Sequence, residues 1–162
     1  MITVAILTIS DSAMAGKRED VSGPALKHRC LELKWHVAAT QIVADDEQVI
    51  RSILADWADC EIADVILTTG GTGISPLDVT PEATRAVLDR EIPGIAELLR
   101  SKGLEQTKFS VLSRALAGSR KVSFILNLPG SPKGAVFSLG LVEGLIPHVV
   151  DLLHGRTDHT PQ

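Results

Sequence analysis

Three aspartates, Asp11, Asp45 and Asp78, stand in loops beside short apolar runs that have the composition of buried strands. The loop before Asp78 begins with Gly70-Gly-Thr-Gly73, and three glycines in four residues leave backbone amides open to an anionic ligand. Acids beside an anion site repel the ligand unless a divalent cation lies between them. Mg²⁺ is usually held by one or two carboxylates together with phosphate oxygens. The combination of an amide-rich loop and acids therefore indicates a Mg-nucleotide site.

Each of these features also has an ordinary structural interpretation. Asp45 and Asp46 can serve as helix N-caps. Asp11 can belong to a turn, and Asp78 can cap a helix or form an Asx turn. The glycines fit any tight turn: no Gly-Lys-Ser/Thr of a P-loop follows them, and Pro76 stands where a dinucleotide fingerprint needs a third glycine. Taken singly, these residues leave both interpretations open.

Two helix starts adjoin the same loops. Thr80 is a good N-cap and Pro81 a good first helical residue, which predicts a helix directly after the glycine turn. Pro129-Gly-Ser-Pro-Lys133 joins an apolar run to the last helix. Ser131 or the Gly130 amide can cap the helix and also bind a phosphate, while Lys133 adds a positive charge near the helix N-terminus. The alternative is an ordinary strand-to-helix turn.

The elements that must position these loops alternate between strands and helices along the chain. Strands are expected at Val4–Ile9, His36–Val43, Val65–Thr69 and Val122–Leu128. Helices are expected at Val21–Leu33, from Asp45 and Asp46 through Trp57, at Pro81–Leu88, at Gly94–Lys102, at Thr107–Leu116 and from Lys133 to about His154. This alternation predicts an α/β fold with helices layered on a mostly parallel central sheet. Ligands bind such sheets at the carboxyl ends of the strands, where all the loops above should meet.

Length and composition exclude several classes of protein. With 162 residues, 44% hydrophobic and 22% charged, the chain fits one globular domain over 1–162, ending in a flexible tail at 156–162. A net charge of −4 and 3% aromatic residues argue against a nucleic-acid partner. The N-terminal run reads as a strand rather than a signal peptide, and no apolar run reaches the ~18 residues of a membrane span. The cytoplasm is the expected compartment.

Five motifs follow one another in the chain: Thr8-Ile-Ser-Asp11, Thr68-Thr-Gly-Gly-Thr-Gly73, Asp78-Val-Thr-Pro-Glu82, Leu112-Ser-Arg-Ala115 and Asn127-Leu-Pro-Gly-Ser-Pro132. In content and order they resemble the molybdopterin-binding proteins of the MogA/MoaB type, over nearly the whole chain. The resemblance implies a three-layer α/β sandwich that is commonly trimeric. It also implies an enzyme of molybdenum cofactor biosynthesis, which uses Mg-ATP to adenylylate molybdopterin and releases pyrophosphate.

The same resemblance assigns roles to individual residues. Asp78 looks like the acid that the reaction needs and Asp45 like a second acid, and together they would hold Mg²⁺. Contacts with the nucleotide and the pterin phosphate are expected from Ser10, Asp11, Gly70, Gly71, Thr72, Gly73, Thr80, Glu82, Pro129, Gly130, Ser131, Pro132 and Lys133. The implied partners are molybdopterin, ATP, further copies of the chain in a homotrimer or hexamer, and a downstream molybdenum-insertion protein.

One residue departs from the family pattern. Leu77 stands directly before Asp78, where adenylylating members often carry Arg. This difference favours an alternative function, a molybdopterin-binding or carrier protein of the same fold without turnover. Asp78, Thr80 and Glu82 favour the enzyme, and a generic nucleotide-binding or scaffold domain is a third interpretation.

The last predicted helix is apolar on two faces, which bears on oligomerisation. One face carries Val136, Leu139, Val142, Ile146, Val149 and Leu153, and the other carries Leu141, Leu145 and Leu152. A helix that is apolar over so wide an arc is either central in the fold or covered by another subunit. The pattern therefore agrees with the trimer that the resemblance implies.

Overall fold

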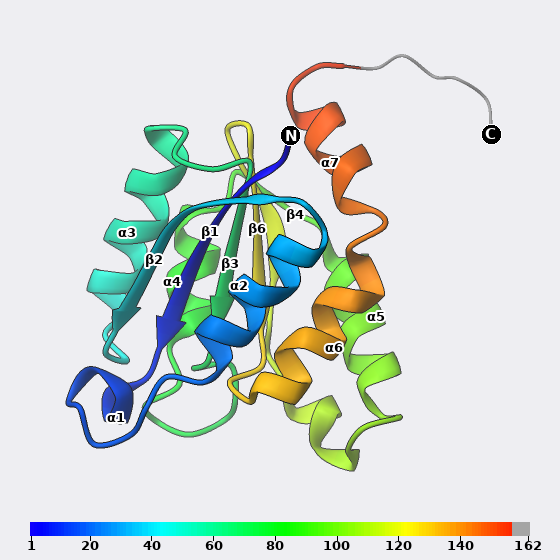
Figure 1. The fold of residues 1–162 in the computed structure, drawn as a ribbon. Helices are drawn as coiled ribbons and strands as arrows, with labels where there is room; N and C mark the ends of the chain where they lie inside the picture. The colour runs from blue at the N-terminus through cyan, green and yellow to red at the C-terminus, as the bar shows by residue number, and fades with distance from the viewer. Residues whose placement is uncertain (157–162) are drawn as a thin grey trace.

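A six-stranded sheet with the strand order β2-β1-β3-β6-β5-β4 forms the centre of the computed structural model, which describes residues 1–156 (Figure 1). Its strands are β1 (Thr3–Ile9), β2 (His36–Val43), β3 (Val65–Thr69), β4 (Arg90–Glu91), β5 (Ala117–Arg120) and β6 (Ser123–Leu128). The first four strands of this order are parallel, whereas β5 and β4 extend the sheet antiparallel. The prediction of a mostly parallel sheet is confirmed. Of the tail expected at 156–162, only Arg156 is described, and the rest lies outside the described residues.

The three central strands carry continuous apolar runs because both of their faces are covered. All residues of β3 and β6 are buried, as is β1 from Val4 onward. In the pairing register, Thr8 of β1 lies opposite Thr69 of β3, and Thr69 lies opposite Leu128 of β6. The carboxyl ends of these three strands therefore lie side by side.

Helices cover the two faces of the sheet and make two hydrophobic cores (Figure 1). They are α2 (Ser22–Glu32), α3 (Glu47–Asp59), α4 (Thr80–Val87), α5 (Pro93–Gly103), α6 (Pro132–Val142) and α7 (Ile146–Leu153). The short helix α1 (Asp11–Met14) and the 3₁₀ turn η1 (Lys108–Leu112) contribute no residue to either core. One core packs α3 and α4 on the sheet, and the other packs α2, α5, α6 and α7. Successive residues of β1 alternate between the two cores, since Ile6 belongs to one and Leu7 to the other.

The prediction of a helix at Thr107–Leu116 is wrong. The segment forms the short turn η1 and then leads into β5, which pairs with β6. The buried Asn127 explains the difference: its side-chain oxygen accepts from the Leu116 amide at 3.1 Å, and its backbone amide donates to the Leu116 carbonyl at 2.9 Å. These long-range bonds draw the segment onto the sheet and outweigh its local helical pattern.

The prediction of a single long helix ending near His154 is also wrong. The segment forms two helices, α6 and α7, and the chain bends by 65° between them. Pro147 lies in the first turn of α7, where its ring cannot continue a helix from the preceding turn. At the bend, Arg29 of α2 pairs with Glu143. Within residues 1–156, no single helix is long and apolar enough to cross a membrane, and α6 and α7 pass that test only as a bent pair.

Candidate active site

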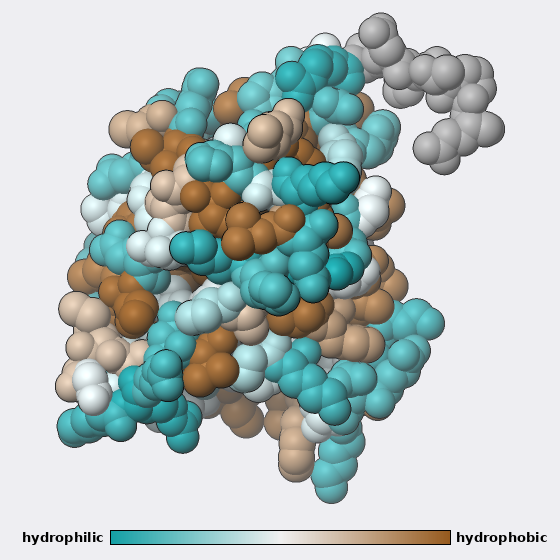
Figure 2. All heavy atoms as spheres, viewed as in Figure 1, coloured by the Kyte–Doolittle hydropathy of each residue, from teal (hydrophilic) through white to brown (hydrophobic). Residues whose placement is uncertain are grey.

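A cavity of about 840 Å³ opens at the sheet edge where β1, β3 and β6 end. Of the residues predicted for the site, it is lined by Ser10, Asp11, Asp45, Gly70, Gly71, Asp78, Gly130, Ser131 and Pro132. The loop between β1 and α2 adds further lining residues, and hydrophilic residues gather over this loop at the lower left of Figure 2. The chain order alone had indicated this edge, and the structure does bring these loops together there.

The glycine turn packs so closely against its surroundings that no side chain fits. Gly70 and Gly71 have φ angles of 104° and 68°. A Cβ on Gly70 would lie 2.2 Å from the Ile9 carbonyl oxygen, and one on Gly71 would lie 2.3 Å from the hydroxyl oxygen of Thr80. Glycine supplies both the positive φ and the space, so bare backbone forms this part of the cavity wall.

Thr80 does not cap helix α4, contrary to the prediction. It is the first residue of the helix after Val79, and its hydroxyl donates to the Gly70 carbonyl at 2.9 Å. Its amide donates to the Gly71 carbonyl at 3.2 Å, and the residue is fully buried. The hydroxyl is thus engaged in fixing the glycine turn, and Thr80 supports the cavity wall from behind instead of lining it.

The adjacent acids after β2 have separate surroundings. Asp46 is the N-cap of α3, and its carboxylate accepts from the amides of Gln48 and Val49 at 3.0 and 3.1 Å. Asp45 instead pairs with Asp11: each backbone amide donates to the other residue's carboxylate, at 2.8 and 3.2 Å. The capping interpretation therefore holds for Asp46, while Asp45 lines the cavity.

The acids at the cavity repel one another. Burial raises the pKa of Asp45, and the negative charges of Asp11 and Asp78 raise it further, against the lowering effect of the hydrogen bond from the Asp11 amide. A cation bound beside these carboxylates would stabilise their charged forms, because it would offset the repulsion among the three negative charges. The electrostatics thus agree with the chemistry expected from the sequence.

Asp78 closes a local turn and also lines the cavity. One of its carboxylate oxygens accepts from the Ser75 amide at 2.9 Å, and its own amide donates to the Ser75 carbonyl at 2.9 Å. A Cβ on Gly73 would lie 2.7 Å from the same carboxylate oxygen. The absence of a side chain at Gly73 therefore leaves room for the Asp78 carboxylate. Asp78 forms a local turn, as the structural interpretation of the sequence proposed, and it also lines the cavity.

Several predicted site residues lie elsewhere. Thr72, Gly73 and Pro129 line a second cavity of about 340 Å³ next to α5, η1 and α6, which shares Ser131 with the first. Lys133 is exposed on α6 and lines neither cavity. Glu82 is exposed on α4 and bonds to Arg114, and this hydrogen bond lowers the pKa of Glu82. The prediction that these residues share one site surface is therefore corrected for this group.

Sequence reasoning missed a role for Arg114. Its guanidinium donates to the carbonyl oxygens of Gly73 and Asp78, at 2.8 and 2.9 Å, and so contacts both ends of the loop that carries Asp78. The available signal was the motif Leu112-Ser-Arg-Ala115, which contributed to the family resemblance without any function attached.

The donor set at the cavity suits Mg²⁺ better than a structural metal. No group of three or more His, Cys, Asp or Glu side chains within residues 1–156 is arranged to hold a metal ion. A structural zinc site needs about four such ligands, whereas Mg²⁺ needs one or two carboxylates with phosphate and water oxygens. Asp45 and Asp78, which line one cavity beside an amide-rich turn, fit the second pattern.

The fold and the site together define a class of protein. Residues 5–148 match the family model described as a probable molybdopterin binding domain, and the chain belongs to this family. It is 40% identical over 160 residues to the molybdopterin adenylyltransferase of Helicobacter pylori strain J99, a match that covers 96% of this chain and 89% of the relative. The crystal structure of the molybdopterin biosynthesis enzyme MoaB from Thermus thermophilus is 48% identical, with a TM-score of 0.90 over 96% of this chain and 98% of that one.

A longer relative contains only one region like this chain. The molybdenum cofactor synthesis protein cinnamon of Drosophila melanogaster is 42% identical over 156 residues. The match covers 94% of this chain but 26% of the Drosophila protein. The expected MogA/MoaB-type fold is therefore confirmed, both by the family and by the solved structures.

Proposed function

We propose that the chain is a molybdopterin adenylyltransferase of molybdenum cofactor biosynthesis. It joins the adenylyl group of ATP to the terminal phosphate of molybdopterin and releases pyrophosphate. Relatives with this name, 34–40% identical over 95–96% of the chain, support the assignment. The observation in the structure that carries it is the meeting of Asp11, Asp45 and Asp78 with the bare glycine turn at one cavity.

The reaction asks the protein for positioning and charge neutralisation. A phosphate oxygen of molybdopterin attacks the α-phosphorus of ATP, the bond to pyrophosphate breaks, and no side-chain nucleophile is needed. The Gly70 amide is bonded to Leu128, so the Gly71 amide and the N-terminus of α6, capped by Ser131, are the donors that we assign to phosphate oxygens. Asp45 and Asp78 would hold Mg²⁺, which offsets negative charge on the phosphates when it is bound.

Roles for the other predicted residues follow from their positions. Substrate contacts are assigned to the residues of the first cavity, which are Ser10, Asp11, Gly70, Gly71, Gly130, Ser131 and Pro132. Thr72, Gly73 and Pro129 contact a substrate only where it extends into the neighbouring cavity. Thr80 supports the glycine turn, and Lys133 adds positive charge to the first turn of α6.

The proposal includes a homotrimer, with a hexamer as the alternative, and a single domain over residues 1–162 in the cytoplasm. Exposed apolar side chains support self-association, among them Leu145 and Leu152 of the predicted second apolar face. The family match over residues 5–148 supports one domain. The adenylylated product requires an acceptor, for which a molybdenum-insertion protein is the proposed partner.

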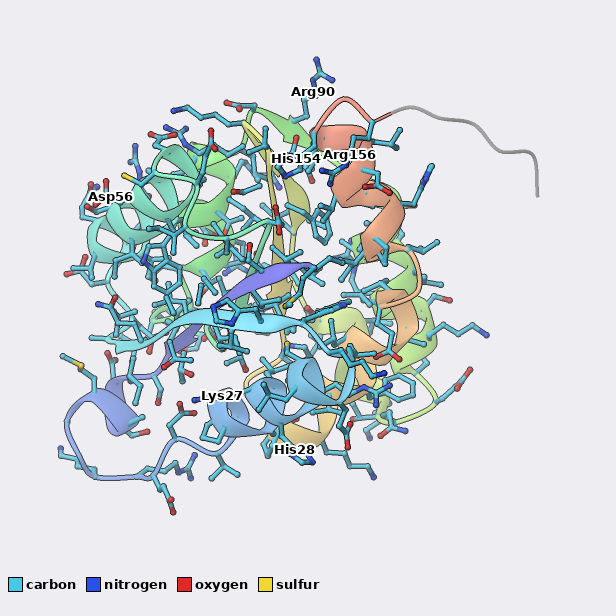
Figure 3. The ribbon with its side chains drawn as sticks, turned by 45° about the horizontal axis from the view of Figure 1, so that its top comes forward. Lys27, His28, Asp56, Arg90, His154 and Arg156 are labelled. Atoms are coloured by element: carbon cyan, nitrogen blue, oxygen red, sulfur yellow. The ribbon has the colours of Figure 1, made fainter. Side chains whose placement is uncertain are left out.

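The test is to mix the purified protein with molybdopterin and Mg-ATP and to measure pyrophosphate. We expect release by the wild type and at least about a 100-fold loss in Asp78→Ala, with pterin binding retained. Asp56→Ala is the control, because Asp56 is an exposed acid on α3, outside the first cavity (Figure 3).

Two results would contradict the proposal. A wild type that binds molybdopterin without releasing pyrophosphate would favour the carrier function, for which the exposed Leu77 in the cavity wall is the one structural argument. Unchanged release by Asp78→Ala would remove Asp78 from the catalytic site.

A further inference from the structure

The loop that carries Asp78 has few attachments to the rest of the protein. Its residues 74–77 are all exposed, so little packing holds them. The bonds between Ser75 and Asp78 close the loop on itself. Within residues 1–156, the hydrogen bonds that join residues 73–78 to other parts of the chain are both donated by Arg114.

Arg114 holds this loop at its two ends. Its Nε donates to the Gly73 carbonyl at 2.8 Å and its Nη2 donates to the Asp78 carbonyl at 2.9 Å. Its backbone amide donates to the Thr72 carbonyl at 2.8 Å, which fixes the arginine beside the glycine turn. A planar guanidinium can make these divergent contacts at once, whereas a lysine ammonium cannot reproduce the fork.

Glu82 orients the guanidinium from the other side. The third nitrogen, Nη1, bonds to the Glu82 carboxylate on the first turn of α4. Arg114 and Glu82 line an outer cavity of about 440 Å³, and neither lines the cavity that contains Asp11, Asp45 and Asp78. Arg114 therefore reaches the candidate active site through the loop, with its charge directed to the outer surface.

We propose that Arg114 is a positioning residue that sets where the Asp78 carboxylate lies relative to Asp45, and that Glu82 acts by holding Arg114. Without the two bonds, the loop keeps its internal turn but loses its fixed position against the sheet. The two proposed Mg²⁺ ligands then no longer meet the metal and the phosphates in one geometry. This inference rests on the proposed function, and it replaces the substrate contact predicted for Glu82.

The experiment compares Arg114→Ala, Arg114→Lys and Glu82→Gln with Arg85→Ala. Arg85 is the matched control, because it lines the same outer cavity and pairs with Glu91 at 2.9 Å without bonding the loop. For each variant, kcat, the KM for molybdopterin and the Mg²⁺ concentration for half-maximal activity are measured. The fraction of folded protein is measured beside them.

For Arg114→Ala, we expect kcat to fall about 10- to 100-fold and the Mg²⁺ midpoint to rise about 10-fold, with the KM for molybdopterin unchanged. Arg114→Lys should recover little of the lost activity, because lysine restores the positive charge but cannot donate to the Gly73 and Asp78 carbonyls at the same time. Added guanidinium at low millimolar concentration should restore part of the activity of Arg114→Ala, since the side chain is 37% exposed and its space opens outward.

A purely structural role makes a different prediction. It lowers the folded fraction and leaves the Mg²⁺ midpoint and the kcat per folded molecule unchanged, and this result would overturn the inference. If Arg114→Ala does not fold, the same measurements on Glu82→Gln decide between the two roles. A raised Mg²⁺ midpoint supports the positioning role, and an unchanged midpoint supports the purely structural one. If the wild type releases no pyrophosphate, the proposed function fails. Weaker binding of Mg-ATP to the Arg114 variants by calorimetry then still supports the positioning role, and equal binding refutes it.

Discussion

Asp45 and Asp46 are neighbours in the sequence, and the fold uses them for different purposes. Asp46 satisfies two amides at the start of α3, which is a contribution to stability. Asp45 is partly buried beside two other acids, so its negative charge destabilises the folded state. Destabilising groups of this kind are typical of ligand-binding sites. Their substitution should therefore separate stability from activity.

Replacement of the cap should affect folding alone. Asp46→Ala is expected to lower the free energy of unfolding by about 1 kcal/mol, because two helix amides lose their acceptor. Its kcat should equal that of the wild type. Chemical denaturation and the pyrophosphate assay test both statements, and a large loss of kcat in the folded variant would contradict the division of roles.

Replacement of the cavity acid should do the reverse. Because the folded state raises the pKa of Asp45, its charge opposes folding, and the contribution of Asp45 to the free energy of unfolding should rise as pH falls through the folded-state pKa. Asp45→Asn removes that charge, so its Tm without Mg²⁺ should be no lower than that of the wild type, while pyrophosphate release should be lost. A clearly lower Tm would show that the charged form stabilises the fold.

At the scale of elements, the glycine turn joins three strand ends. The Gly70 amide donates to the Leu128 carbonyl at 3.2 Å, and its Cα faces the Ile9 carbonyl. The turn thus bonds β3 to β6 and packs against the end of β1, while Gly70 and Gly71 also line the cavity. Its backbone conformation serves the sheet as well as the site.

Two glycine substitutions should have opposite effects. Gly70→Ala is expected to destabilise the protein by about 1–3 kcal/mol from backbone strain, with a further cost from the contact with the Ile9 carbonyl. Gly140→Ala is the control in the exposed part of α6, where a Cβ meets nothing within 4 Å. It should stabilise the protein by about 0.5–1 kcal/mol through helix propensity. Urea denaturation distinguishes the two, and a neutral Gly70→Ala would contradict the strained turn.

At the scale of the whole molecule, a polar contact joins distant parts of the chain away from the candidate site. The Asp64 carboxylate accepts from the amide and the hydroxyl of Thr3, both at 2.8 Å, and it contacts His154 at 2.9 Å. It thereby connects the start of β1, the residue before β3 and the end of α7, which Figure 3 shows at His154. Burial raises the pKa of Asp64, but the hydrogen bonds from Thr3 and His154 outweigh it, and the net pKa is lowered.

The lowered pKa predicts a defined loss of stability in acid. The contribution of Asp64 is complete above its unfolded pKa, near 3.8, and is lost as pH falls through the lower folded-state value. Asp64→Asn should therefore be less stable than the wild type at pH 7, and the difference should shrink as pH falls below 3.8. Denaturation curves across this range test the prediction, and a difference independent of pH would contradict it. The variant's kcat should be unchanged.

The proposed homotrimer is also a property of the whole molecule. Light scattering should give three times the 17.3 kDa of the chain. Leu152→Glu should weaken the assembly, because it places a charge on an exposed apolar position of α7. Leu31→Glu, at an exposed leucine of α2, is the control. A wild type that is purely monomeric would refute the trimer.

The sequence by itself determined the centre of the fold and the edge that carries the site. The strands β1, β3 and β6 could be predicted because a strand covered on both faces must be apolar throughout, and that pattern is local. Alternation with helices then required a parallel sheet, and a parallel sheet places its strand-end loops together. The helix caps at Asp46 and Ser131 were likewise available from local sequence.

The tertiary structure decided what depends on residues far apart in the chain. The strand β5 forms because Asn127 binds Leu116, which no periodicity in residues 107–116 encodes. Thr80 faces a carbonyl instead of capping its helix because the glycine turn folds back over it. Arg114 meets the loop of Asp78 across 36 residues of sequence. Such contacts arise only when the sheet has formed, so local patterns identified the acids and glycines, and long-range hydrogen bonds determined which of them face the cavity.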